Sequence, residues 1–243
     1  MARTFDGSND YLRNASFTVA ASKTKFTLSA FMKRASGGKA MFGCWDSSTN
    51  NLQHGFAVLL WSDGNAYVMY GNGDSSQYAY VANTTYDVYQ HVFVHFDGGL
   101  TGNSNRLKLW IDGVQQTLTY NVNTNTTTSA NLSSIWAGAR PNGPEYGAGA
   151  VTRLAAWHGV DMGETEADAI AGGTAPSSYS SGLIDYWPCT TTSGDEVGTT
   201  YTLTDNGGVG YEADPSFGGG GGVVIPVFMH HYRQQGKIGR ASC

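Results

Sequence analysis

Two stretches near the middle of the chain place apolar side chains at every second position. They cover residues 92–96 and 107–111, and each ends at an Asp-Gly pair, at 97–98 and at 112–113. A period of two predicts strands with one buried face, and Asp-Gly is a common short turn signal. The pattern predicts an antiparallel β protein and excludes a helical one.

The same type of pattern continues along most of the chain. Residues 26–33 alternate, whereas 41–45 and 56–61 are apolar throughout, as expected where both faces of a strand are covered. Turn signals such as Ser62-Asp63-Gly64-Asn65 recur every 8–12 residues, which is typical of a sandwich or barrel. Further strands are predicted at 4–12 (with a turn at 7–10), 66–70, 78–82, 134–138, 151–157, 184–186 and 201–204.

One segment departs from the strand pattern. Residues 163–171 carry Glu164 and Glu166 at their start and are followed by two glycines. Acidic side chains favour the first turn of a helix, and glycine terminates one. We expect one short helix there.

Composition places the chain among all-β domains. It has 243 residues, of which 33 are glycine and only 14% are charged. No apolar run approaches the roughly 20 residues that cross a bilayer, and the first residues lack the apolar region of a secretory signal. Cys44, Cys189 and Cys243 form an odd set without close spacing, which disfavours a disulfide framework or a zinc site and leaves a single Cys44–Cys189 bridge open.

Charge divides the chain into an acidic body and a basic tail. The 14 Lys+Arg and 19 Asp+Glu residues give a net charge of −5. Three of the bases and none of the acids follow residue 217, so the rest carries 11 bases and 19 acids, a net of −8. An acidic body argues against nucleic acid as a partner.

The order of motifs resembles a known family. Residues 5–12, 26–33, 91–94, 107–113, 135–138 and 153–158, followed by the predicted helix, resemble the laminin-G-like, concanavalin A-like jelly roll over residues 1–217. The resemblance implies two antiparallel sheets packed face to face. It also implies a family of lectins, pentraxins, glucanases and adhesion modules that is common in structural proteins of tailed bacteriophages.

Candidate catalytic and metal-binding residues are few. A glucanase of this fold needs carboxylates alternating on one strand, and the nearest match, 164–168, falls in the predicted helix. His91 and His95 would lie roughly 13 Å apart on a strand, too far to share a metal, and are interpreted as surface or ligand-face histidines. Some family members bind calcium, so Asp6, Asp46, Asp97 and Asp112 are candidates for its ligands, although no residue is assigned. We expect no catalytic site, no metal ligand and no cofactor.

Aromatic side chains are the candidates for ligand contact. Trp45, Trp61 and Tyr70 are the candidates for contact with a glycan or a protein partner, although packing in the core is the favoured interpretation of these aromatic residues.

The tail is the candidate for assembly. The glycine run 218–222 predicts a flexible linker between the domain and residues 223–243. The tail is apolar first and basic second, which favours docking on a neighbouring subunit over a loose terminus. The predicted docking residues are Val223, Val224, Ile225, Val227, Phe228, Tyr232, Arg233, Lys237 and Arg240.

Together these features predict a non-enzymatic virion structural protein, a phage capsid decoration or fibre component. It would be made in the host cytoplasm and held in a larger, oligomeric assembly by its C-terminal tail. A carbohydrate-binding adhesin module, with cell-surface glycans as partners, is the alternative. A glycoside hydrolase or lyase is the third interpretation.

Overall fold

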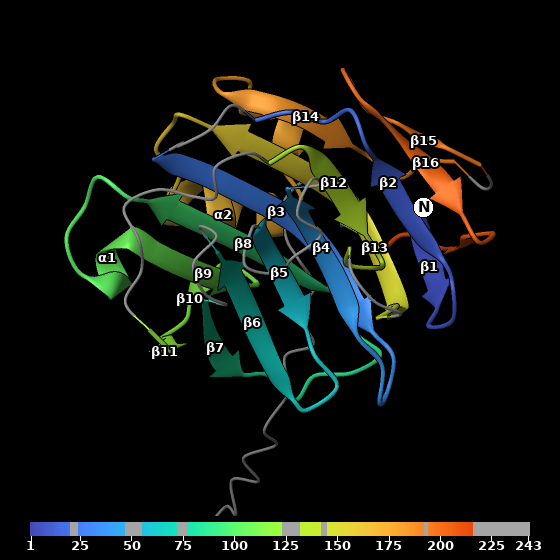
Figure 1. Cartoon of the computed structure of the whole chain (residues 1–243), viewed down its shortest axis with the longest axis horizontal. Coiled ribbons are helices and arrows are strands. Elements are labelled where there is room, and N and C mark those ends of the chain that lie inside the picture. The colour runs from blue at the N-terminus through green and yellow to red at the C-terminus, as the bar shows by residue number, and fades with distance from the viewer. Residues whose placement is uncertain are drawn as a thin grey trace, which may run out of the picture.

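The fold is a sandwich of two antiparallel sheets, which confirms the predicted class (Figure 1). A computed structural model describes residues 1–19, 24–46, 55–71, 77–122, 132–141, 145–191 and 194–215. Sheet A has the spatial order β10 (Val114–Gln115), β9 (Leu107–Ile111), β8 (Gln90–Asp97), β3 (Lys25–Arg34), β13 (Ala148–His158), β1 (Ala2–Asp6) and β17 (Gly210–Glu212), and β14 (Leu183–Trp187) also pairs with β13.

Sheet B forms the second layer. Its order is β11 (Thr119–Tyr120), β7 (Tyr78–Ala82), β6 (Asn65–Tyr70), β5 (Gly55–Leu60), β4 (Ala40–Trp45), β12 (Ser134–Ala137), β2 (Tyr11–Asn14), β16 (Thr202–Asn206) and β15 (Glu196–Val197). The described helices are α1 (Asn103–Arg106), α2 (Glu164–Ala171) and a 3₁₀ turn, η1 (Pro176–Ser178). The short helix expected at 163–171 is therefore confirmed as α2.

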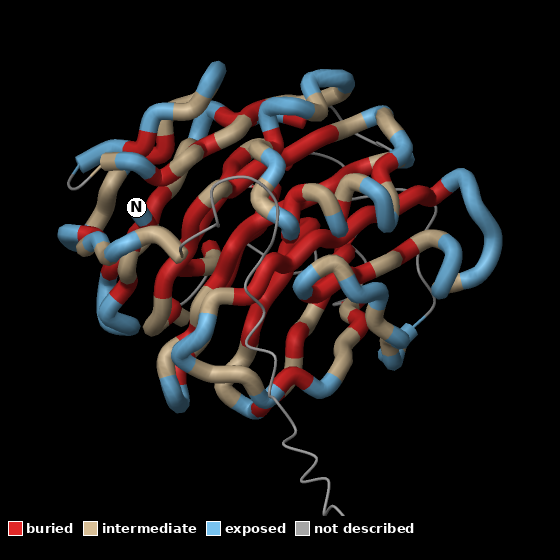
Figure 2. The backbone as a smooth tube through the Cα atoms, turned by 180° about the vertical axis from the view of Figure 1, so that it is seen from behind, coloured by how far each residue is buried: buried red, intermediate tan, exposed pale blue. Residues whose placement is uncertain are grey.

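The main core lies between the sheets. Alternation along each strand directs every second side chain inward, among them Val94 and Leu109 from sheet A and Phe42 and Val58 from sheet B, all fully buried. Figure 2 shows the buried residues in red along the strands in the middle of the molecule. The inward set contains the alternating apolar positions of both stretches that predicted the strands.

The outer face of sheet A is also buried, contrary to the expectation of half-buried strands. Phe93 and Trp110 project outward, with ring centroids 5.6 Å apart, and pack with Ala167 and Ile170 of α2. The alternation of apolar residues reveals the face of each strand that packs against the other sheet. It does not reveal that the outer face is buried too, because the residues that cover the outer face lie about 60 positions further along the chain. Gly163 is the N-cap of helix α2, and its backbone N–H donates to the Glu166 carboxylate at 2.8 Å.

Turn chemistry agrees with the sequence. Asp112 and Gly113 join β9 to β10 with φ of 52° and 80°, the positive values that a type I′ hairpin turn requires. Residues 62–64 join β5 to β6, where the Asp63 carboxylate accepts the Asn65 N–H at 3.0 Å.

The beginning of the chain differs from the prediction. Residues 4–12 are not one strand with a turn, because β1 belongs to sheet A and β2 to sheet B. Arg3 of β1 is fully buried and pairs with Glu196 at 3.0 Å and with Asp205 at 3.1 Å. The guanidinium thus ties the first strand of sheet A to β15 and β16 of sheet B.

Several smaller features were not predicted. Helix α1 lies between β8 and β9, where no helix is predicted, and β10, β11, β15 and β17 were missed. Cys44 and Cys189 are buried free thiols, and burial raises the pKa of both. Among the described residues, no helix is both long enough and apolar enough to cross a membrane. The linker and the tail lie outside the described residues.

Candidate functional site

The outer face of sheet B is rich in aromatic side chains. Leu12 and Ile135 point into the core, so their strand neighbours Tyr11, Arg13 and Trp136 project from the opposite face. Both described α-helices contact strands of sheet A instead. We call this surface the aromatic face. Its buried centre is Met41, Trp45, Ala57, Leu59, Met69, Trp136 and Ala139, and its partly buried aromatic side chains are Tyr11, Trp61, Tyr67, Tyr78 and Tyr146.

A stack of four groups runs across β2 and β12. Tyr11 stacks on Trp136 with centroids 5.0 Å apart and on Tyr146 at 6.3 Å. Arg13, directly opposite Trp136 in the strand register, places its guanidinium carbon 4.6 Å from the Trp136 ring. The indole is 9% exposed, so it supports the stack, while Tyr11 and Tyr146 keep accessible surface.

Trp61, at the end of β5, forms a second group on this face. Lys39 Nζ lies 3.8 Å from its ring centroid and the Arg140 guanidinium carbon lies 5.7 Å away. Glu145 contacts both cations, Arg140 at 2.6 Å and Lys39 at 3.9 Å. Trp61 is therefore an aromatic ring held beside two cations that share one carboxylate.

Three tyrosines form the third group. Tyr67 of β6 lies 5.7 Å from Tyr78 and 5.6 Å from Tyr80, both on β7. The Tyr67 hydroxyl donates to the Asp63 carboxylate at 2.7 Å, and this bond raises the pKa of Tyr67 to about 12. The phenol therefore stays protonated and its ring is held in place.

The predicted contact aromatics separate into three environments. Trp61 is partly buried on the aromatic face, so it remains available to a ligand. Trp45 projects from the same face but has no exposed surface, and Tyr70 is 3% exposed and points into the core between the sheets. Trp45 and Tyr70 are thus buried, in line with the favoured interpretation of core packing, and only Trp61 of the three stays accessible. Composition does not reveal on which face of a strand a ring lies or what covers it. The nine predicted docking residues, Val223 to Arg240, lie outside the described residues.

Sequence reasoning missed Tyr11, Tyr146 and Arg13 as members of this face. Strand alternation was a usable signal for Tyr11 and Arg13, since these two residues flank the inward Leu12. Tyr146 offered none, because it joins the face through an isolated bridge to Ala139.

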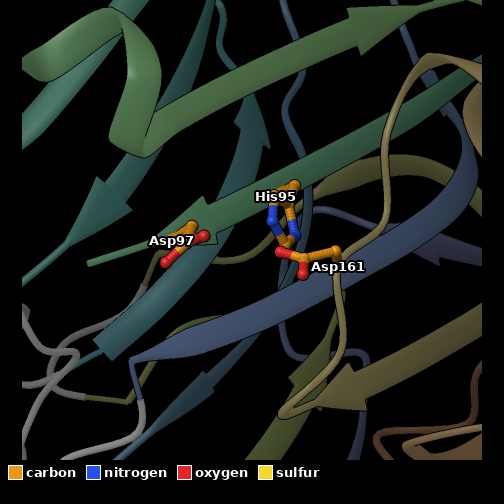
Figure 3. A group of neighbouring side chains, drawn as sticks. All are labelled: His95, Asp97 and Asp161. Atoms are coloured by element: carbon orange, nitrogen blue, oxygen red, sulfur yellow. The ribbon is translucent and has the colours of Figure 1, made fainter. Parts of the chain in front are cut away.

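A group of ionisable side chains lies at one end of sheet A (Figure 3). His95, Asp97 and Asp161 place one ligand atom each within 4.8 Å of one another, and Figure 3 shows the Asp161 carboxylate beside the His95 ring. Lys25 Nζ lies 2.5 Å from Asp161 and 3.5 Å from Asp97. We call these four residues the His95 group.

The His95 group is an ion-pair arrangement in which Lys25 supplies the cation. Burial lowers the pKa of His95 to about 4, so its ring is neutral near pH 7, and its Nδ1 lies 2.8 Å from the hydroxyl of Thr27. The hydrogen bond from Lys25 lowers the pKa of Asp161, which keeps that carboxylate ionised. A neutral imidazole and two carboxylates are suitable ligands for a divalent ion, but such an ion would have to displace the Lys25 ammonium.

Both histidines of β8 are buried, contrary to the interpretation of surface or ligand-face residues. His91 is 1% exposed and His95 is 5% exposed. Each contacts a hydroxyl of β3, since His91 Nε2 lies 2.9 Å from the Ser29 oxygen. Alternation of apolar residues along β8 predicts only one buried face.

The four aspartates considered for calcium do not converge in the described part of the chain. Of the four, only Asp97 belongs to the described group of ligand-bearing side chains. Asp6 accepts the Ser8 N–H at 2.7 Å and Asp112 accepts the His91 N–H at 2.7 Å. Their carboxylates thus stabilise turns and strand ends.

The chain belongs to the Concanavalin A-like lectin/glucanases superfamily, whose family model matches residues 6–162. This confirms the resemblance on which the fold was predicted. A search of curated proteins found no match to this sequence.

Solved structures agree on the fold. The chain is similar to a native heptameric SAP-like pentraxin from Limulus polyphemus, with 16% identity and a TM-score of 0.51 over 70% of this chain and 81% of that one. Other similar structures are the CBM40 of a Ruminococcus gnavus IT-sialidase (11% identity, TM-score 0.48, 70% of this chain and 98% of that one) and the enzymatically active domain of bacteriophage CBA120 tailspike protein 2 (13%, 0.45, 76% and 33%). At these identities the similarity shows the fold alone.

Proposed function

We propose that this protein is a non-enzymatic glycan-binding domain and that the aromatic face is its binding surface. The observation that carries the proposal is the set of partly buried rings on one face of sheet B, Tyr11, Trp61 and Tyr146 above all. Aromatic rings held rigid by their neighbours stack on the apolar faces of sugars at low entropic cost. Membership of a superfamily named for lectins and glucanases supports carbohydrate as the ligand class.

Rigidity distinguishes this surface from an ordinary set of exposed aromatics. Tyr11 packs on Trp136 and on Tyr146, and Trp61 packs on the ammonium of Lys39. Side chains that already occupy one position lose little freedom when a ligand binds. The face therefore suits weak, stacked recognition of a chain of sugars.

The carboxylate pair of the His95 group supports the non-enzymatic part of the proposal. A glycosidase needs one carboxyl group with a raised pKa to act as the acid and a second carboxylate nearby. The His95 group brings Asp97 and Asp161 together, but Lys25 lies against both and lowers the pKa of Asp161. This pair is suited to holding an ammonium group and poorly suited to donating a proton.

Affinity electrophoresis tests the proposal directly. The full chain would be run through gels that contain dextran, galactan, polygalacturonate or dextran sulfate, beside the variants Trp61→Ala and Tyr11→Ala. Tyr211→Ala is the matched control, because Tyr211 is a 56% exposed tyrosine on sheet A. We expect at least one polysaccharide to retard the wild type and the control, and the retardation to fall at least several-fold in the two face variants.

Two results would contradict glycan binding at this face. One is the absence of retardation by every polysaccharide of the panel. The other is equal retardation of wild type, Trp61→Ala and Tyr11→Ala, provided that circular dichroism shows all three to be folded. Release of reducing sugar by the wild type would contradict the non-enzymatic part alone.

Assembly through the tail is a second, compatible proposal that rests on the sequence. The last described residues follow β17 at the edge of sheet A, where Asp214 lies 3.5 Å from the N-terminal amine of Met1. The described residues thus end beside sheet A, whereas the aromatic face belongs to sheet B. A virion component could be attached through its tail and bind glycans through its aromatic face.

Truncation tests the assembly proposal. Deleting residues 218–243 should leave a folded domain that binds polysaccharide but no longer enters particles when it is co-expressed with candidate neighbouring subunits. A truncated chain that assembles as well as the full chain would refute tail docking and would leave the glycan proposal intact.

A further inference from the structure

We infer that the aromatic face is selective for anionic glycans, whose carboxylate or sulfate groups bind the cations placed beside its rings. This inference rests on the proposed function and narrows its ligand class. Anion selectivity is supported by the distribution of charge and by the pairing of each cation, whereas glycan binding is supported by the aromatic rings.

Some basic residues of this acidic protein are paired with acids, and Lys33 among them also lies 5.2 Å from the centroid of the Tyr89 ring. Arg3 is buried between Glu196 and Asp205, Lys25 is held by the His95 group, and Lys33 lies 2.5 Å from the Glu212 carboxylate. These cations are neutralised within the fold. Arg13, Lys39 and Arg140 instead lie against rings of the aromatic face, with Glu145 as the only acid in the described ion pairs of the three.

The Arg13 guanidinium is the first cation that supports anion selectivity. Its guanidinium lies over the Trp136 ring, and it belongs to none of the ion pairs between described residues. Its Nε is buried without a hydrogen-bond partner there. A stacked guanidinium keeps its N–H groups in the plane of the fork, the geometry that binds a carboxylate or sulfate with two parallel hydrogen bonds.

The charged residues beside the Trp61 ring also support anion selectivity. Lys39 and Arg140 share the single carboxylate of Glu145, so the three residues retain one positive charge beside the ring. The Nε of Arg140 is also buried and unpartnered among the described residues. This net positive charge attracts an arriving anion.

Sequence adjacency joins the two cation groups. Glu145 precedes Tyr146, which stacks on Tyr11, and Tyr11 stacks on the indole that carries Arg13. In the register of β2 and β12, Tyr11 lies on the side of Arg13 that faces the end of β12, which Arg140 follows in the chain. A glycan that rests on these rings meets a cation on either side, which favours a polymer with repeated negative charges.

Paired polymers test the inference. Polygalacturonate would be compared with its fully methyl-esterified form, which keeps the backbone and loses the charge, and dextran sulfate would be compared with dextran. The variants are Arg13→Gln and Lys39→Gln, with Lys108→Gln on sheet A as the control that removes an equal charge elsewhere. Thermal melting establishes that each variant is folded.

We expect the charged member of at least one pair to bind at least tenfold more tightly than the neutral member. Arg13→Gln and Lys39→Gln should each weaken that binding by about tenfold, the effect of losing one charge-assisted hydrogen bond, while Lys108→Gln should not. A preference confined to polygalacturonate identifies carboxylate as the recognised group, and one confined to dextran sulfate identifies sulfate.

Equal binding of charged and neutral members would overturn anion selectivity and leave glycan binding standing. An equal loss of affinity in Lys108→Gln would overturn it too, since it would indicate non-specific attraction to a polyanion. Failure of all four polymers and of the wider panel to bind would overturn the proposed function itself.

Discussion

Removing the buried histidines of β8 should make the domain more resistant to mild acid. His91 and His95 pack between the sheet and its outer covering, and burial lowers their pKa values from 6.5 to about 3 and about 4. A histidine that is neutral when folded takes up a proton on unfolding whenever the pH lies below about 6.5. Stability is therefore greatest above that pH and falls as the pH decreases toward the folded-state values.

The size of the effect follows from these pKa values. Each pKa unit corresponds to about 1.4 kcal/mol. Between pH 7 and pH 5 a histidine of unfolded pKa 6.5 gains nearly one proton on unfolding, so each buried ring costs about 2 kcal/mol over this interval. The two together should lower the free energy of unfolding by about 4 kcal/mol. Ordinary carboxyl groups change little in this interval, because they titrate near pH 4.

Urea denaturation of the wild type, His91→Gln and His95→Gln at pH 7 and pH 5 measures this directly. Glutamine keeps a hydrogen-bonding group near Ser29 or Thr27 and removes the titration. Each variant should lose about half of the wild-type pH dependence. Phe93→Leu is the control, because it weakens the packing beside His91 and should lower stability equally at both pH values. An unchanged pH dependence in His91→Gln, or an NMR titration of His91 near pH 6.5, would refute the reasoning.

Two further variants test other contacts of the fold. Arg3→Met leaves Glu196 buried and breaks the tie to Asp205, so urea denaturation should show a loss of about 3–5 kcal/mol, and a loss below 1 kcal/mol would argue against the ion pair. Gly43→Ala would place its Cβ 2.2 Å from the Cβ of Ala57 on the neighbouring strand, so we expect a loss of roughly 1–3 kcal/mol and a lower melting temperature. A melting temperature equal to that of the wild type would show that β4 and β5 separate without cost.

The alternating pattern predicted most of the strands because each has at least one apolar face turned toward the partner sheet. It could not predict that β1 and β2 enter different sheets, since local sequence carries no information about which strand lies beside which. The two-residue strands also escaped, because β10 and β15 are too short to show a period. The outer covering of β8 and β9 depends on a helix distant in sequence.

The candidate site was less accessible to sequence reasoning than the fold. Trp61 was identified from its residue type, but Tyr70 has the same composition signal and lies in the core. Trp61 lies on the aromatic face and Tyr70 in the core because of the register of β5 and β6 and the turn at residues 62–64. The contacts of Arg13 and Lys39 with aromatic rings join residues that are distant in the chain, so they become visible only in three dimensions.

Chemical-shift mapping with trigalacturonate tests the central claim most directly. If the outer face of sheet B binds glycans, the largest changes should fall on the backbone and ring signals of Tyr11, Trp61 and Tyr146. Signals of His95 and Asp161 at the end of sheet A should stay in place. Changes centred on the latter pair, with Trp61 unaffected, would contradict the account.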